Sequence, residues 1–222
     1  MTAATTVTTT PRQGEFPYVF AYDITDDDRR KAVLKCLKRW RVDGQYSVHE
    51  TWLRSPQARE LSVELCELID RKKDSLVVCR LDQHKSSPIY QMQVMSKEPP
   101  LTGKPRPIPV PKQLPKGNYV ICYDIREPKR LQRIQRLTVK QSGYLQRSVY
   151  LYQGNGIGLL KLLKTIYAQM EGTDDLRIYN LSHIRDMWFL SQDKPVVPEM
   201  IRYQVQTGEK TWWQRLFKWI RG

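Results

Sequence analysis

The sequence lacks long hydrophobic runs and closely spaced cysteine pairs. No stretch approaches the roughly 20 apolar residues that a membrane-spanning helix needs, and the N-terminal residues do not have the pattern of a secretory signal. The four cysteines show no Cys-x-x-Cys spacing, and each lies in an otherwise apolar run. We therefore expect small buried side chains in a reducing, cytoplasmic compartment, and neither disulfides nor zinc ligands.

Acidic residues are few relative to basic ones. Among 222 residues there are 37 Lys and Arg against 23 Asp and Glu, which gives a formal net charge of +14. This balance favours a polyanionic partner, with nucleic acid first and an anionic membrane surface second. The length allows one large domain or two small ones.

The sequence repeats itself at an offset of about 100 residues. Residues 18–24 (YVFAYDI) match residues 119–125 (YVICYDI), and residues 45–48 (QYSV) match residues 146–149 (QRSV). Near the end of each copy, residues 74–81 align with residues 174–181. Three matches in the same order indicate a tandem duplication.

Both copies show the same predicted order of elements. Each begins with an aromatic and β-branched run, typical of a buried strand, which is followed by an amphipathic helix. In the first copy, Asp43-Gly44 is expected to break this helix, an extended stretch follows at 45–53, and a second helix starts at Ser55-Pro56. A closing strand completes each copy. This order predicts an α+β protein of two tandem ferredoxin-like domains, a fold that by itself does not decide function.

The predicted boundaries divide the chain into five parts. Residues 1–16 are Thr-rich and expected to be disordered, residues 17–97 form the first domain with an extra strand, and residues 118–192 form the second. Between them, residues 98–117 are rich in proline and predict a stiff, extended linker. We favour a plain spacer over a ligand for an aromatic groove. Residues 193–222 form a C-terminal tail.

The tail ends in a basic, tryptophan-rich segment that predicts an amphipathic helix. Its apolar face comprises Trp212, Leu216, Trp219 and Ile220. Such a helix can dock on a protein partner, pack on its own domain or enter a membrane surface. We favour docking on a protein and expect no membrane partner.

Asp23 and Asp124 each stand at the end of the first predicted strand of a copy. If the copies pack about a twofold axis, the two carboxylates meet. Two carboxylates with water suit Mg²⁺, which can generate hydroxide and stabilise a phosphoryl transition state. The alternative is that each aspartate is a turn or cap residue, the role that we assign to the run Asp26–Asp28 with the nearby Thr25.

Basic residues follow both aspartates in the first predicted helix of each copy. They are Arg29, Arg30 and Lys31 in the first copy, and Lys129, Arg130 and Arg133 in the second. They suit either the binding of nucleic-acid phosphates or a solvated helix face, and the sequence supports both equally. Because Tyr150 is the counterpart of His49, a histidine base required in both halves is excluded.

These motifs together resemble the CRISPR-associated protein two family. The resemblance covers residues 18–81 and 119–181 and rests on Tyr22-Asp23-Ile24, Arg29-Arg30 and the segments 45–48 and 74–77. It implies a ferredoxin-like dimer whose fifth strands cross to the partner's sheet. It also implies that the matching aspartates face each other and can bind a divalent metal. This chain would then be a covalent pseudo-dimer.

The resemblance implies two functions. In spacer acquisition the dimer is mainly a scaffold that holds duplex prespacer DNA and bridges subunits of the CRISPR integrase, and some family members are metal-dependent nucleases. His49 and the pair Lys129-Arg130, taken as the counterpart of Arg29-Arg30, depart from the family pattern and favour the scaffold. The alternative is a magnesium-dependent nuclease with Asp23 and Asp124 as its catalytic pair. Under the scaffold interpretation, the resemblance makes the tail a candidate docking element for the integrase. An RNA-recognition module ranks last, because its stacking motif is missing.

Overall fold

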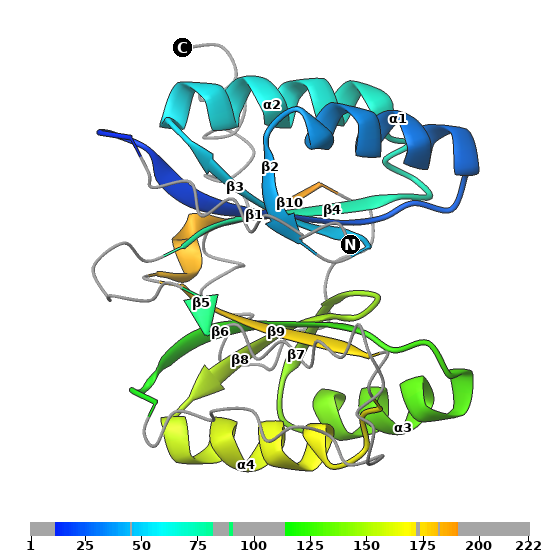
Figure 1. Cartoon of the computed structure of the whole chain (residues 1–222), viewed down its shortest axis with the longest axis vertical. Helices are drawn as coiled ribbons and strands as arrows, with labels where there is room; N and C mark the ends of the chain where they lie inside the picture. The colour runs from blue at the N-terminus through cyan, green and yellow to red at the C-terminus, as the bar shows by residue number, and fades with distance from the viewer. Residues whose placement is uncertain are drawn as a thin grey trace, which may run out of the picture.

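The computed structural model describes residues 12–44, 46–81, 89–90, 114–171, 174–181 and 183–190. These residues form two halves, each a five-stranded antiparallel sheet with two α helices (Figure 1). Within these ranges no helix is long and apolar enough to cross a bilayer. Most of the predicted linker and the whole tail, with Trp212, Leu216, Trp219 and Ile220, lie outside the described residues.

The first half follows the predicted order. It contains β1 (Phe16–Asp23), α1 (Asp27–Lys38), β2 (Arg41–Gly44), β3 (Val48–Leu53), α2 (Ser55–Leu68) and β4 (Ser75–Arg80). The side chain of Asp26 accepts a hydrogen bond from the backbone N–H of Arg29 and caps α1, which confirms the predicted cap. The prediction that Asp43-Gly44 breaks the helix is wrong, because α1 ends at Lys38 and these two residues belong to β2.

The second half repeats the first. It contains β6 (Gly117–Asp124), α3 (Pro128–Val139), β7 (Gly143–Gln146), β8 (Val149–Gly154), α4 (Gly156–Tyr167) and β9 (Asp175–Leu181). Pro128 stands in the first turn of α3, where the missing N–H costs no helical hydrogen bond. The strand registers confirm the duplication, because equivalent rows cross the central strands: Glu50–Val19–Cys79 in the first half and Leu151–Val120–Tyr179 in the second.

Each half contributes one edge strand to the sheet of the other half. Strand β5 (Ile89–Tyr90) follows the first copy but pairs with β9. After a 3₁₀ helix (η1, Ile184–Asp186), β10 (Met187–Leu190) ends the second copy and pairs with β4. The sheet orders are therefore β10-β4-β1-β3-β2 and β5-β9-β6-β8-β7. This reciprocal exchange confirms the intramolecular pseudo-dimer.

The helices cover only the outer face of each sheet, and the two inner faces pack against each other (Figure 1). Between the sheets lies one apolar cluster made by both halves, which includes Val19, Val48, Val77 and Cys79 of the first and Val120, Val149, Leu151 and Tyr179 of the second. Two further clusters lie between each sheet and its own helices. The contact between the halves is therefore a third core.

An aromatic stack occurs at equivalent places in the two halves, with one difference. Tyr22 stacks on His49 with ring centroids 5.6 Å apart, and Tyr123 stacks on Tyr150 at 5.5 Å. His49 is fully buried, and neither of its ring nitrogens has a hydrogen-bond partner among the described residues. Burial lowers the pKa of His49 to about 4, so the ring is neutral near pH 7.

We expect the substitution His49→Phe to stabilise the protein. It keeps a stacked ring and removes buried polar atoms without partners, each of which costs about 1–3 kcal/mol. The unfolded chain takes up a proton on His49 below its usual pKa of 6.5, whereas the folded chain does so only near pH 4. The free energy of unfolding of the wild type should therefore fall as the pH drops through this window, and that of the variant should fall less.

Denaturant titrations of both proteins at neutral pH and at about pH 5 test this expectation. The stability difference between variant and wild type should be larger at the lower pH. A difference that stays the same, or one that favours the wild type, would contradict the neutral, unpaired state of His49.

Candidate functional site

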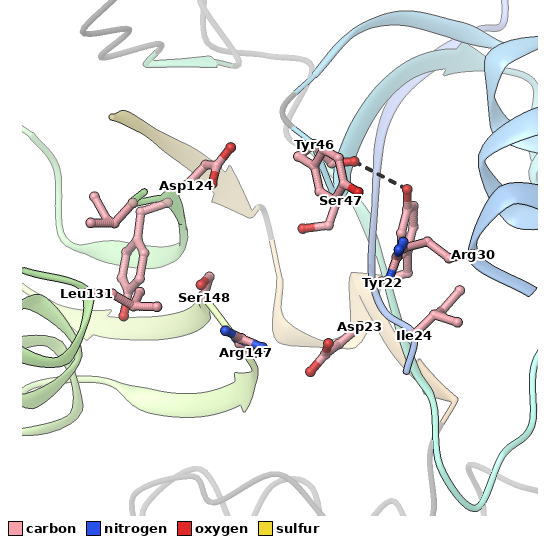
Figure 2. Close-up of a pocket in the computed structure, with 12 residues that line it drawn as sticks. Tyr22, Asp23, Ile24, Arg30, Tyr46, Ser47, Asp124, Leu131, Arg147 and Ser148 are labelled. Carbon is pink, nitrogen blue, oxygen red and sulfur yellow. Dashed lines mark hydrogen bonds between the residues drawn. The ribbon is translucent and has the colours of Figure 1, made fainter. Parts of the chain in front are cut away.

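A pocket lies between the halves at the ends of β1 and β6 (Figure 2). Residues at equivalent positions of the two copies line it in pairs: Tyr22 and Tyr123, Asp23 and Asp124, Ile24 and Ile125, Arg30 and Leu131, Tyr46 and Arg147, Ser47 and Ser148. The pocket therefore lies on the pseudo-twofold axis that relates the halves. The structure brings the two predicted aspartates into this one pocket.

Each of the two carboxylates has an arginine of the second half nearby. Burial raises the pKa of Asp23, and Arg147 opposes that rise. Burial also raises the pKa of Asp124, where Arg126 opposes it. Figure 2 shows the side chain of Arg147 beside Asp23, so the second half contributes a cation to the aspartate of the first.

A tight turn between β7 and β8 holds Arg147 at the pocket. The next residue, Ser148, has a φ of 62°, in the left-handed region that residues other than glycine adopt uncommonly. The Ser148 carbonyl accepts a hydrogen bond from the backbone N–H of Tyr123 at 3.1 Å, which fixes the turn to the central strand. In the first half, Tyr46 takes the place of Arg147, and its carbonyl accepts a hydrogen bond from the Tyr22 hydroxyl at 3.2 Å (Figure 2).

A buried ion pair fixes the first helix of each half to its sheet. Asp74 accepts a hydrogen bond from Nε of Arg29 at 2.7 Å, and Asp174 accepts one from Nε of Arg130 at 2.6 Å. The side chains of both aspartates are 0% exposed, while Arg29 is 29% exposed and Arg130 only 6%. These two predicted phosphate-binding arginines therefore position the helices, and Arg130 has little surface to offer a ligand.

The ion pair that α1 and α3 have in common corrects the expected sequence alignment of these two helices. We expected Lys129-Arg130 to take the place of Arg29-Arg30. The ion pairs instead make Arg29 equivalent to Arg130, so Leu131 stands where the first half has Arg30. The expectation was wrong by one residue because it matched residue types and not contacts.

The next two basic residues at the start of α1 have acidic neighbours. Arg30 pairs with Asp27 and Lys31 with Asp28, each three residues earlier, whereas no ion pair is seen for Lys35 and Lys38 within the described residues. Exposed pairs of this kind contribute little to stability, but they partly neutralise the helix surface. The start of α1 is therefore a weaker attractant for anions than its basic residues alone suggest.

Helix α3 presents a different surface, which we call the basic stripe: Lys129, Arg133, Arg136 and Lys140. The spacing of four, three and four residues places all of them on one helix face, and all are exposed. The helix contains no acidic residue, and none of the stripe residues forms an ion pair within the described part of the chain. Sequence reasoning named Lys129 and Arg133 but missed Arg136 and Lys140, although their helical spacing was a usable signal.

The fold and the pocket define a ferredoxin-like pseudo-dimer with paired aspartates on its axis. The family model of CRISPR associated protein Cas2 matches residues 17–88 and 118–187, which correspond to the two halves. The chain therefore belongs to the Cas2 family, as a tandem fusion of two copies.

Relatives of this chain match about one copy at a time. A CRISPR-associated endoribonuclease Cas2 from Allochromatium vinosum is 43% identical over 68 residues, which are 31% of this chain and 72% of that protein. The CRISPR-associated endoribonuclease Cas2 3 from Synechocystis sp. is 38% identical over 90 residues, 40% of this chain and 94% of that protein. The crystal structure of a hypothetical protein from Thermus thermophilus is 32% identical and covers 31% of this chain and 84% of its own, with a TM-score of 0.30.

We expect the substitution Asp174→Asn to destabilise the protein more than Asp74→Asn. It leaves Arg130 buried beside Glu171 alone, whose side chain is 70% exposed, and breaking a buried pair costs about 3–5 kcal/mol. After Asp74→Asn water can still reach Arg29, and the loss of stability in that variant should therefore be smaller. Denaturant titrations compare the two variants with the surface variant Asp28→Asn, which should be close to the wild type. Equal losses at Asp74 and Asp174 would contradict the difference in burial.

Proposed function

We propose that this chain binds duplex DNA through the phosphate backbone, without reading its sequence, as a scaffold of CRISPR spacer acquisition that bridges integrase subunits. The observation that carries the proposal is the basic stripe on α3. Exposed lysines and arginines without acidic partners can bind phosphates and release counterions, which gives affinity without sequence information. Membership of the Cas2 family supports the link to CRISPR, and the net charge of +14 supports a polyanionic partner.

The proposed surface extends from the basic stripe across the axis to the first half. Helices α1 and α3 both start at the end of the molecule where the pocket lies, since they follow the strands that end at Asp23 and Asp124. At that end Arg147 of the second half and Arg30 of the first line the pocket. A duplex laid along this end would meet cations from both halves.

Among the basic residues expected from the sequence, the proposal gives Lys129 and Arg133 the main part in phosphate binding. The pairing of Arg30 and Lys31 with aspartates makes them weaker contributors. This ranking is testable because the two helices can be altered separately.

We expect the triple variant Lys129→Ala/Arg133→Ala/Arg136→Ala to bind duplex DNA more weakly whatever its sequence. Fluorescence anisotropy at several salt concentrations measures affinity and its salt dependence. Each lost phosphate contact should make the log–log salt slope shallower by about 0.9, so the triple variant should lose up to about 3 in slope.

The matched control is the triple variant Arg30→Ala/Lys31→Ala/Lys35→Ala on α1, which removes the same charge and includes both cations that pair with aspartates. It should reduce the affinity and the slope less than the α3 variant does. An equal effect of both variants would point to the net charge and not to the stripe. A log–log salt slope near zero for the wild type would contradict the proposed binding to the phosphate backbone.

The scaffold role is tested by the light-scattering mass of a mixture of this chain, its organism's CRISPR integrase and a short DNA duplex. We expect a complex of one copy of this chain with four integrase subunits, since the chain already supplies both copies of a dimer. The predicted docking helix is tested by removing residues 211–222, which should weaken that complex. If no complex forms with the intact chain, the scaffold role is contradicted.

A second candidate is a metal-dependent phosphodiesterase acting on RNA or DNA, favoured by the two aspartates in one pocket and by the endoribonuclease names of the relatives. Mg²⁺ is often held by one or two carboxylates and several waters, so Asp23 and Asp124 fit it. The cavity of about 290 Å³ has room for a hydrated ion at about 30 Å³ per water molecule. The described residues contain no group of three or more acidic, His or Cys side chains that could hold a metal ion, so water would complete the coordination.

If this second function exists, Asp23→Asn and Asp124→Asn should each abolish Mg²⁺-dependent cleavage and leave the melting temperature nearly unchanged. Cleavage should also decline from neutral towards mildly acid pH, because burial raises the pKa of both carboxyls and metal binding needs them ionised. Gel assays with labelled RNA and DNA measure both effects, with Asp28→Asn as the control. Undiminished cleavage by both variants would assign the activity to another site or a contaminant.

A further inference from the structure

A buried ionic cluster joins the two halves inside the apolar layer between their sheets. Glu50 on β3 is 6% exposed, while Arg177 and Tyr179 on β9 are 2% and 0% exposed. Nη1 of Arg177 donates a hydrogen bond to Oε1 of Glu50 at 2.6 Å, and the Tyr179 hydroxyl donates to the same oxygen at 2.8 Å. We call these three residues the pairing cluster.

Carboxylates from both halves surround Arg177. Its Nε donates to Oδ2 of Asp175 at 3.2 Å, and its Nη1 lies 3.4 Å from Oδ2 of Asp43 in the first half. These two aspartates are partly exposed, so they lie at the rim, whereas Glu50 is the buried partner. The guanidinium therefore has a buried carboxylate partner only when a first half and a second half are packed together.

The place related to this cluster by the pseudo-twofold axis is apolar. The strand registers identify the counterparts: Leu151 for Glu50, Val77 for Arg177 and Cys79 for Tyr179. All three counterparts are buried in the same cluster between the sheets. The interface between the halves is thus ionic on one side of its axis and apolar on the other.

Packing two identical halves in this way would separate Glu50 from Arg177. Two first halves would place Glu50 against Val77 and Cys79 on both sides of the axis, with two buried carboxylates and no buried cation. Two second halves would place Arg177 against Leu151 twice, each guanidinium keeping only the partly exposed Asp175 of its own half. A buried charge without its partner is strongly unfavourable, far more than an intact pair is favourable.

We propose that the pairing cluster makes the inner face of the first half fit only a second half, its own or that of another copy of this chain. The cluster acts mainly by rejecting the wrong partner, since the apolar counterparts show that the interface does not need an ion pair to close. This inference concerns the assembly of the halves and does not rest on the proposed function.

The test starts from the full chain with a protease site placed within residues 98–113 and cleaved after folding, so that both halves stay in the complex. The cleaved protein is unfolded in denaturant, refolded by dilution and weighed by native mass spectrometry. We expect pairs of unlike halves to exceed each kind of like pair by about a hundredfold or more. Two first halves bury two Glu50 carboxylates without Arg177, and two second halves leave each buried Arg177 with only the partly exposed Asp175 of its own half. Like and unlike pairs in statistical proportion would overturn the proposal.

A matched variant replaces the pairing cluster by its own counterparts: Glu50→Leu/Arg177→Val/Tyr179→Cys. The same cleavage and refolding should now give like and unlike pairs in nearly statistical proportion. If the variant keeps the selectivity of the wild type, the pairing cluster is not its source.

The uncleaved chain supplies a measurement that does not depend on refolding of separate halves. Glu50→Leu alone leaves Arg177 buried without its buried partner, whereas the triple variant removes both charges. Glu50→Leu should therefore unfold at a clearly lower denaturant concentration than the triple variant. Equal midpoints would show that Glu50 and Arg177 are not coupled, and the proposal would fail.

Discussion

Each sheet has helices on only one face, and the other face must be covered by the other half. This constraint accounts for the apolar side chains of both halves that meet between the sheets, such as Val19 and Val120. It also accounts for the exchanged edge strands, since β5 and β10 each extend a sheet of the opposite half. The pocket with Asp23 and Asp124 exists only because the two faces are joined.

Much of this could be predicted because the signals are local and occur twice. The aromatic and β-branched runs fix the central strands, Ser55-Pro56 marks the start of α2, and the repeat places the two aspartates at equivalent strand ends. Contacts between distant residues could not be predicted in the same way. Glu50 and Arg177 lie 127 residues apart, and each looks like an ordinary polar residue of a strand. The equivalence of Arg29 and Arg130 became visible only through their aspartate partners.

The two halves share a backbone but differ in where they place charge. At the start of α1 the first half pairs Arg30 and Lys31 with aspartates, while the basic stripe of α3 forms no ion pair within the described residues. At the pocket, Arg147 replaces Tyr46, and within the core Glu50 replaces Leu151. The two halves therefore differ in charge on the first helix, at the pocket and in the core between the sheets.

Glu50 lies on one side of the pseudo-twofold axis only, and this has a consequence for how the sequence of such a protein can evolve. In a dimer of identical chains every substitution appears on both sides of the axis, so a new interface charge arises twice and must be compensated twice. In this chain each codon specifies one side only. Glu50 and Arg177 needed to arise once each, and the two halves are free to drift apart in sequence while the fold that they share is kept.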